Sequence, residues 1–351
     1  MGAQGRFRGA RHDDGGLRRR GAEEARRPVT PTRALVTGAT GQDGSYLVER
    51  LVAEGAEVHA LVREGEERVP SLPDGVHRHT GDLTRGADLE ALVAEVEPQE
   101  VYNLGGISSV ALSWSEPALT AQASGVAVGH LLKASHELQE RTGRAVGFVQ
   151  ASSAEVFGWA EHVPQDEDTP IRPVTPYGAA KAYAHHLVGV YRRRGLRAAS
   201  CILYNHESPR RPETFVTRKI TAGVARIATG RQDVLSMGNL DARRDWGWAP
   251  DYVDAMVRAV RHESGGDFVI ATGQAHSVRD FVAAAFAGAG ITDWEGLVTL
   301  DPRFARPSDA PEQVGDPARA QAQLGWAPSV VFADVVTRMV EHDLELARSE
   351  L

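Results

Sequence analysis

A tyrosine and a lysine four residues apart are the side chains of this sequence best suited to proton transfer. Tyr177 and Lys181 form a Y-x-x-x-K pair that opens a stretch rich in alanine and apolar residues. On a helix this spacing places both side chains on one face. A nearby ammonium favours the phenolate, so we expect Lys181 to lower the pKa of Tyr177 and prepare it as a general base.

The composition supports a specific role for Lys181. Only three of the 39 basic residues are lysines, at positions 133, 181 and 219. A lysine that persists in so arginine-rich a chain indicates a need for a compact ammonium with a tunable pKa.

A hydroxyl and a carboxylate follow a predicted strand at residues 146–150. Ser153 and Glu155 lie where the strand ends, and the carboxyl ends of strands line the ligand crevice of an open α/β sheet. There a hydroxyl can hydrogen-bond a reacting oxygen, and a carboxylate can move a second proton. Helix capping by the serine and a solvent-facing turn for Glu155 are the structural alternatives. The presence of Tyr177 favours the catalytic interpretation.

A glycine-rich loop near the start of the predicted fold indicates a dinucleotide. Gly38, Gly41 and Gly44 form G-x-x-G-x-x-G between a short apolar strand and an amphipathic helix. Glycines there allow a tight turn and let the backbone approach a pyrophosphate at the helix N-terminus. An ordinary glycine-rich turn is the alternative.

The end of the second predicted strand bears on the choice of cofactor. Arg63 follows that strand, where an NADP site offers arginine and an NAD site a carboxylate. We therefore expect NADP, although Glu64 is adjacent and Arg63 could also be a solvated strand-end residue.

Short apolar strands alternate with helices of about a dozen residues from Arg33 onward. The pattern predicts strands at 34–37, 57–62, 76–80, 101–104 and 146–150, with helices after Gly44, over 88–96, after Pro117 and after Tyr177. This rhythm is typical of an α/β fold with a doubly wound parallel Rossmann sheet. After Tyr204 it becomes irregular, with helices expected near 217–228 and 330–346, which predicts a smaller, loop-rich C-terminal substrate lobe.

Three segments follow from these patterns. Residues 1–31 are rich in arginine and glycine, lack the apolar stretch of a secretory signal, and predict a disordered tail. Residues 32–204 are expected to form the NADP-binding Rossmann domain. Residues 205–351 are expected to form mainly the substrate lobe, with parts returning to the Rossmann domain.

Composition excludes several classes of protein. The net charge of −8 argues against nucleic-acid binding, and no run of 18 apolar residues predicts a membrane span. The single Cys201 excludes an internal disulfide framework and a cysteine-based zinc cluster, and we identify no metal site. We expect a cytoplasmic protein.

Longer strings in the chain carry a resemblance. GATGQDGSYL at 38–47, NHESPRR at 205–211, VTRKI at 216–220 and GNLDARRDWG at 238–247 look like the GDP-mannose 4,6-dehydratases, within the extended short-chain dehydrogenase/reductase superfamily. The resemblance runs from about Arg33 to Leu346, and it implies a lyase of nucleotide-sugar metabolism that acts on GDP-mannose.

The resemblance implies an internal hydride cycle with tightly bound NADP. Tyr177, assisted by Lys181, would remove the proton from the hydroxyl on carbon 4 of the mannose, while Ser153 bonds that oxygen. Hydride would pass to NADP, Glu155 would take the proton from carbon 5 as water leaves carbon 6, and the hydride would return to carbon 6. NADP is thereby regenerated in each turnover.

The resemblance also implies contacts, residue by residue. Besides Tyr177, Lys181 and Arg63, the expected cofactor contacts are Gly38, Thr40, Gly41, Gln42, Asp43, Gly44, Asp82, Leu83, Leu104, Gly105, Gly106, Ser108, His206 and Arg211. The expected contacts with GDP-mannose are Asn205, Glu207, Lys219, Arg244, Arg306 and Asp309.

Some positions depart from the family pattern. Ile107 replaces a glutamine near the cofactor, and Leu119 replaces a tyrosine. Ala154 stands where a related dehydratase class has an acidic residue, so Glu155 would serve as both base and acid. The loop at 64–73 is shorter than the one that the family uses for tetramer contacts, so we expect a homodimer through the two long helices after Pro117 and Tyr177.

Two other functions remain open on the sequence. An epimerase, a 4-keto-sugar reductase or another dehydratase of the same superfamily would share Tyr177 and Lys181, but an epimerase or reductase has no need of Glu155. A non-catalytic NADP-binding scaffold would need neither the base nor the carboxylate.

Overall fold

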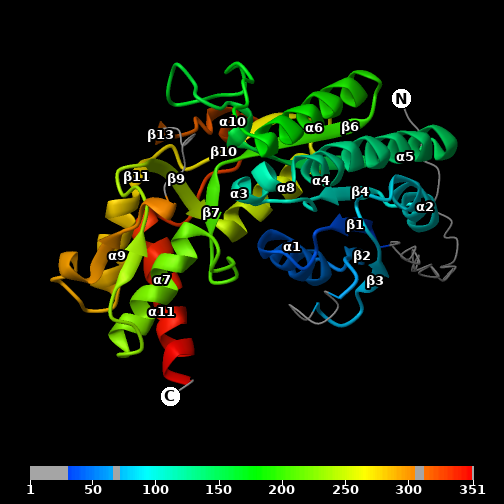
Figure 1. Cartoon of the computed structure of the whole chain (residues 1–351). Coiled ribbons are helices and arrows are strands. Elements are labelled where there is room, and N and C mark those ends of the chain that lie inside the picture. The colour runs from blue at the N-terminus through cyan, green and yellow to red at the C-terminus, as the bar shows by residue number, and fades with distance from the viewer. Residues whose placement is uncertain (1–30, 66–71, 305–311, 350–351) are drawn as a thin grey trace, which may run out of the picture. The chain divides into compact units, whose positions relative to one another are not determined.

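A seven-stranded parallel sheet forms the centre of the fold (Figure 1). The computed structural model describes residues 31–65, 72–304 and 312–349, and Thr32–Leu351 form one compact unit. The strand order is β10-β6-β5-β4-β1-β2-β3. The strands are β1 (Arg33–Thr37), β2 (Glu57–Val62), β3 (His77–Thr80), β4 (Glu100–Asn103), β5 (Gly147–Ser153), β6 (Arg197–Leu203) and β10 (Gly266–Ile270).

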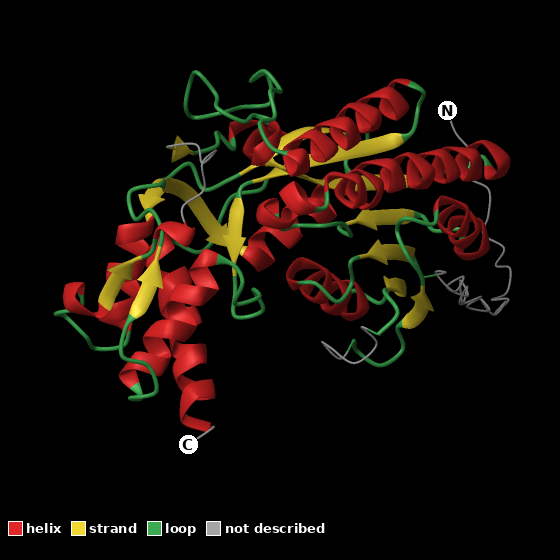
Figure 2. Cartoon of the chain, viewed as in Figure 1, coloured by secondary structure: helices red, strands yellow, loops and turns green. Residues whose placement is uncertain are grey.

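Helices cover both faces of this sheet (Figure 2). One face packs against α2 (Gly86–Val96), α5 (Ala127–Thr142) and α6 (Pro176–Arg193) through a core that includes Leu35 and Val101. The other face packs against α1 (Gln42–Ala53), α8 (Ala249–Arg261) and α10 (Ala318–Leu324) through a core that includes Val36 and Tyr102. Successive residues of β1 and β4 thus serve opposite cores, as buried parallel strands require.

A third core belongs to the C-terminal part of the chain. It joins α7 (Val216–Ala228), α9 (Val278–Gly288) and α11 (Phe332–Ser349). Beside it, β9 (Arg243–Trp248) pairs with β7 (Asn205–Glu207), β11 (Ala275–Ser277) and β13 (Glu312–Gln313), while β8 (Leu235–Met237) pairs with β12 (Val298–Leu300). A buried ion pair between Arg218 and Asp343 ties α7 to α11.

Short helices complete the described part of the fold. They are α3 (Val110–Ser115), α4 (Pro117–Ala121), the π-helical turn η1 (Gln122–Val126), and the 3₁₀ turns η2 (Ala154–Val156), η3 (Glu295–Leu297) and η4 (Pro302–Phe304).

The doubly wound α/β fold predicted from the sequence is confirmed, and the predicted strands agree with β1 to β5 within a few residues. The outermost strand β10 and helix α8 come from the chain after residue 205. Of the tail predicted at 1–31, residues 1–30 lie outside the described residues, as do 66–71 of the shortened loop. No helix in the described part of the chain is both long and apolar enough to cross a membrane.

Candidate active site

The glycine loop between β1 and α1 is shaped by close backbone contacts. Gly38 has a φ of 69°, and a Cβ there would lie 2.8 Å from the backbone nitrogen of Gly105. A Cβ on Gly44 would lie 2.0 Å from the carbonyl oxygen of Gly38. Only glycine therefore fits at these two positions. The absence of side chains at these two positions lets a pyrophosphate approach the backbone at the N-terminus of α1.

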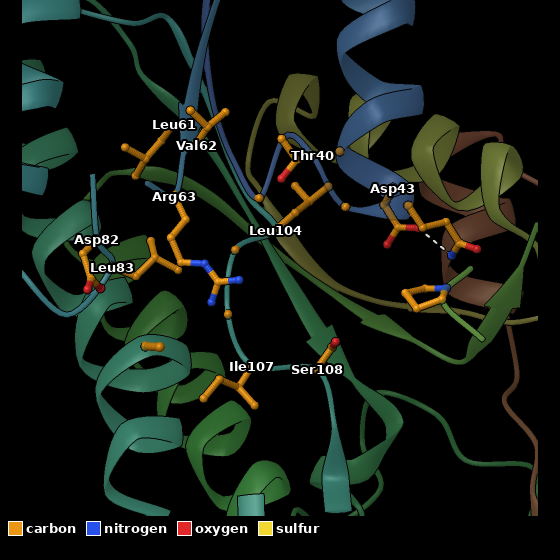
Figure 3. Close-up of a pocket in the computed structure, with 18 of the residues that line it drawn as sticks. Thr40, Asp43, Leu61, Val62, Arg63, Asp82, Leu83, Leu104, Ile107 and Ser108 are labelled. Carbon is orange, nitrogen blue, oxygen red and sulfur yellow. Dashed lines mark hydrogen bonds between the residues drawn. The ribbon is translucent and has the colours of Figure 1, made fainter. Parts of the chain in front are cut away.

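A cavity of 770 Å³ opens from this loop across the carboxyl ends of β1, β2 and β4 (Figure 3). Its volume is that of a site for a dinucleotide-sized ligand. The predicted cofactor residues that line it are Gly38, Thr40, Gly41, Gln42, Asp43, Gly44, Arg63, Asp82, Leu83, Leu104, Gly105, Gly106, Ser108 and Arg211. Ile107 and Leu119, the two departures from the family pattern, line it as well.

Several residues of the cavity wall were not predicted. They are Leu61, Val62, Gly81, Thr84, Leu112, Ala123, Pro212 and Phe215. Leu61 and Val62 end the strand that precedes Arg63, so the strand-end rule that selected Arg63 could have found them. The Arg211 guanidinium carbon lies 3.8 Å from the centroid of the Phe215 ring. No local sequence pattern predicts this contact.

Arg63 and Asp82 lie at one end of the cavity. Figure 3 shows the Arg63 side chain reaching into the cavity beside Leu83. The Asp82 carboxylate accepts hydrogen bonds from the backbone and the hydroxyl of Thr84, at 2.8 and 2.9 Å. These bonds lower the pKa of Asp82, so the cavity offers a fixed carboxylate and a cation at one end.

His206 does not line the cavity wall. It contacts Asp43 of the glycine loop instead. Its Nε2 lies 2.8 Å from Asp43 Oδ2, and its Nδ1 donates to the Tyr204 carbonyl at 2.7 Å. Burial alone would lower the pKa of His206, but Asp43 raises it above its ordinary value. Burial would likewise raise the pKa of Asp43, yet His206 lowers it. Each group therefore favours the charged form of the other, and their 2.8 Å contact anchors the start of α1.

Ser153, Glu155, Tyr177 and Lys181 gather where β5 ends and α6 begins. Thr175 caps α6 by accepting a hydrogen bond from the backbone N–H of Gly178 at 2.9 Å. A Cβ on Gly178 would lie 2.5 Å from the carbonyl oxygen of Glu155, so this glycine lets α6 start against η2. The packing brings the hydroxyl and carboxylate of one element to the tyrosine and lysine of the other.

Tyr177 and Lys181 interact less directly than their spacing predicts. Lys181 Nζ lies 5.8 Å from the centroid of the Tyr177 ring and donates to the Ala151 carbonyl at 2.8 Å. Burial raises the pKa of Tyr177 to about 12, against a hydrogen bond with Ser153 that lowers it. The pKa of Tyr177 is therefore raised overall in this structure, not lowered as expected, because desolvation of the phenolate dominates.

Burial also changes Lys181 itself. The side chain lies inside the protein, and desolvation lowers its pKa to about 8. Asp43 acts in the opposite direction but does not offset the burial. The ammonium thus loses its proton at a lower pH than that of an exposed lysine.

Glu155 contacts the C-terminal part of the chain. Gln313 Nε2 on β13 donates to Glu155 Oε1 at 3.3 Å. In β9, Arg244 is the register partner of Gln313, so one strand pair connects the carboxylate with a predicted substrate residue. Gln313 follows Glu155 by 158 residues, and only the tertiary fold brings the two together.

The predicted substrate residues occupy different settings. Asn205 and Glu207 lie on β7, where the Glu207 carboxylate accepts a bond from Thr217 Oγ1 at 2.6 Å and lies 3.3 Å from Arg211 Nε. Lys219 lies on α7, and burial lowers its pKa while Asp301 opposes this. Arg306 and Asp309 lie outside the described residues.

Comparisons with known proteins agree on one family. The family model described as GDP-mannose 4,6 dehydratase matches residues 35–339. A GDP-mannose 4,6-dehydratase of Vibrio cholerae is 42 % identical over 90 % of this chain and 95 % of its own length. A human GDP-mannose 4,6 dehydratase is 42 % identical over 90 % of this chain and 92 % of its own.

A solved structure shares the fold. The UDP-glucose 4-epimerase of Thermus thermophilus, in complex with NAD, superposes with a TM-score of 0.77 at 27 % identity. The match covers 89 % of this chain and 99 % of that chain.

Proposed function

This chain belongs to the GDP-mannose 4,6-dehydratase family, and we propose that it converts GDP-mannose to GDP-4-keto-6-deoxymannose and water. The observation that carries the proposal is the gathering of Ser153, Glu155, Tyr177 and Lys181 around the junction of β5 and α6. Loss of hydride from carbon 4 needs a base that takes the proton of the hydroxyl on that carbon. Loss of the proton from carbon 5 needs a second base. Tyr177 and Glu155 are the two groups at this site that can fill these roles.

A nicotinamide dinucleotide is the cofactor of this reaction, and we assign it as NADP. When bound, it takes hydride from carbon 4 and gives hydride back at carbon 6. The close backbone turn at Gly38 and Gly44 fits its pyrophosphate, and Arg63 fits a phosphate on its adenosine ribose. His206 and Asp43 keep that loop in place from behind.

Tyr177 accepts the proton of the carbon 4 hydroxyl, and Ser153 hydrogen-bonds the same oxygen. Because burial holds the pKa of Tyr177 near 12, the phenolate must be stabilised within the complex by positive charge nearby. Lys181 is the buried cation on the same helix face, at 5.8 Å from the ring centroid. Its role is to lower the free energy of the phenolate.

Glu155 removes the proton from carbon 5, which is acidic once carbon 4 is a ketone. The proton then leaves with the hydroxyl of carbon 6 as water, so Glu155 acts as base and as acid. Gln313 orients the carboxylate through its 3.3 Å hydrogen bond. Ala154 cannot share this work because it has no titratable group.

The nucleotide diphosphate of the substrate needs cations. Lys219 and Arg244 are the described candidates, and Arg306 is a further one outside the described residues. Asn205 completes the set at β7, where Glu207 positions Arg211 and Thr217. Asp309 is assigned to the same loop as Arg306.

We also propose that two copies of the chain associate through α5 and α6. Apolar side chains face outward along this side of the fold: Tyr183, Val190 and Val126 are 50, 41 and 47 % exposed. Tyr183 and Val190 are seven residues apart on α6 and therefore share one face. A helical face of this kind is typical of a subunit contact.

One experiment tests the proposed reaction. The purified chain is incubated with GDP-mannose carrying deuterium on carbon 4, without added reductant, and the product is analysed by mass spectrometry. We expect the loss of one water and the recovery of deuterium on carbon 6. Unchanged GDP-mannose, or a product formed only with stoichiometric NADPH, would contradict the proposal and favour an epimerase or reductase.

A further inference from the structure

Three histidines and a glutamate cluster at the β2–β3 edge of the sheet, and none of the four lines the cofactor cavity. The parallel register pairs His59 of β2 with His77 of β3, and Leu61 with His79. Side chains two residues apart on a strand share a face. Glu57, His59, His77 and His79 therefore project from the same side of the sheet.

The side chains are close enough to share one ion. His59 Nε2 lies 3.1 Å from Glu57 Oε1, and the His59 and His77 rings stack with centroids 4.6 Å apart. One ligand atom from each of these three residues lies within 4.8 Å of the others. Two nitrogens bound to the same tetrahedral zinc are about 3.3 Å apart, since each bond is about 2.0–2.1 Å. Binding of one ion would therefore require side-chain rotations that bring the three donors to that spacing.

His79 supplies the partner that a metal-bound histidine requires. Its Nε2 lies 2.9 Å from His59 Nδ1, so His59 can donate its Nδ1–H to His79 and leave Nε2 free to bind a metal. Such an outer hydrogen bond fixes the tautomer and the ring orientation of a ligating histidine. His59 is also held firmly, because its side chain is only 12 % exposed.

We propose that Glu57, His59 and His77 bind one divalent transition-metal ion, of the class of Zn²⁺, Co²⁺ or Ni²⁺, with His79 as the positioning residue. Two imidazoles and one carboxylate suit these ions better than Mg²⁺ or Ca²⁺, which prefer oxygen ligands. His77 is exposed, so the ion enters from solvent and water completes its coordination.

The bound ion links β3 to β2 across the edge of the sheet. Arg63 follows β2, and Asp82 follows β3 by two residues, so the link stabilises the two strands that lead to the end of the cavity where these two residues lie. The site is separate from the proposed catalytic residues, and metal binding can succeed or fail independently of the dehydratase reaction.

The test uses the untagged full-length chain, stripped of metal and titrated with Co²⁺ and Zn²⁺. We expect one equivalent of Co²⁺ to produce the visible absorption of a tetrahedral site and to raise the unfolding temperature, and Zn²⁺ to displace it. His77→Gln removes an exposed ligand with little risk to folding and should weaken binding roughly 100-fold or more. His162→Gln, at an exposed histidine outside the cluster, is the matched control and should bind as the wild type does.

His79 is tested by two variants. His79→Gln keeps an acceptor for the His59 Nδ1–H and should retain most of the affinity, whereas His79→Leu should lose roughly 10-fold. The proposal is overturned if the wild-type chain gives no tetrahedral Co²⁺ spectrum, or if His77→Gln binds as tightly as His162→Gln.

Discussion

At the scale of single residues, the proposed role of Glu155 distinguishes dehydration from the other reactions that Tyr177 and Lys181 could support. Glu155→Gln keeps the shape and the contact with Gln313 but removes the base. We expect formation of the 4-keto-6-deoxy product to fall at least about 100-fold, because proton transfer by a positioned group contributes that much or more. Slow oxidation at carbon 4 should survive, visible as NADPH absorbance that does not decay.

Glu161→Gln provides the control for this substitution. Glu161 is an exposed carboxylate six residues further on, and it pairs with Arg172 at the surface. Its loss should leave both steps unchanged. Full dehydratase activity in Glu155→Gln would remove Glu155 from the mechanism.

Burial of Lys181 should have a measurable effect on the free energy of unfolding. Its folded-state pKa of about 8 lies below the ordinary value of 10.5, so between these values the unfolded chain holds a proton that the folded chain has released. Stability therefore rises with pH across this window, and burial of the ammonium is destabilising below it. Lys181→Met should stabilise the chain at pH 7 by about 3 kcal/mol, while abolishing activity.

The substituted methionine leaves no orphaned group, because the Ala151 carbonyl also accepts a bond from Gln150 Nε2 at 2.8 Å. Urea unfolding at pH 7 and pH 10 measures the effect: the advantage of Lys181→Met over the wild type should shrink at the higher pH. Lys133→Met, on the exposed face of α5, should give no such stabilisation. An equal advantage at both pH values would contradict the buried-ammonium account.

At the scale of elements, the sequence predicts what local patterns encode. The strands around 34–37 and 57–62 are apolar runs, and the Gly38–Gly44 loop lies between a strand and a helix, so both can be recognised without a structure. The Y-x-x-x-K spacing likewise places Tyr177 and Lys181 on one turn of α6. These features depend on neighbours within a few residues.

Features that depend on register or topology are not readable in the same way. Gln313 reaches Glu155 only because β13 pairs with β9, and His59 meets His77 only through the β2–β3 register. Strand β10 pairs with β6 although more than 60 residues separate the two strands in the sequence. The direction of the Tyr177 pKa shift could not be predicted from the sequence either. The spacing suggests a neighbouring lysine that lowers the pKa, but burial of the phenol raises it by more.

The exposed face of helix α6 gives a testable prediction about dimerisation. Tyr183 and Val190 lie on its outward face, and both side chains are largely exposed to solvent in the described part of the chain. Tyr183→Glu places a charge at the centre of the proposed α5–α6 contact, where desolvation of an unpaired charge costs several kcal/mol. We expect the dimer to dissociate to a monomer, as measured by light scattering coupled to size exclusion.

Trp159→Glu is a matched control, since Trp159 is 57 % exposed but lies in the loop after β5 rather than on α5 or α6. It should leave the mass unchanged. A wild-type chain that is already monomeric, or a Tyr183→Glu variant that stays dimeric, would reject this interface.

At the scale of the whole molecule, the cavity joins the two halves of the sequence. Its walls come from the strand ends around Arg63 and Asp82 and also from Arg211, Pro212 and Phe215, which lead from β7 into α7. A ligand that fills this cavity would contact both. Its binding free energy therefore contributes to the stability of the entire unit.

This coupling makes cofactor choice visible as a change in unfolding temperature. Saturating NADP should raise the unfolding temperature by several degrees, and more than NAD does, if the Arg63 guanidinium at the cavity wall engages the additional phosphate as proposed. Arg63→Ser should weaken NADP roughly 10- to 100-fold, in line with about 1.5–3 kcal/mol for a charged hydrogen bond, and leave NAD unaffected. Arg85→Ser, at an exposed arginine paired with Asp88, should change neither shift. If Arg63→Ser responds to NADP as the wild type does, the cofactor's phosphate is held elsewhere.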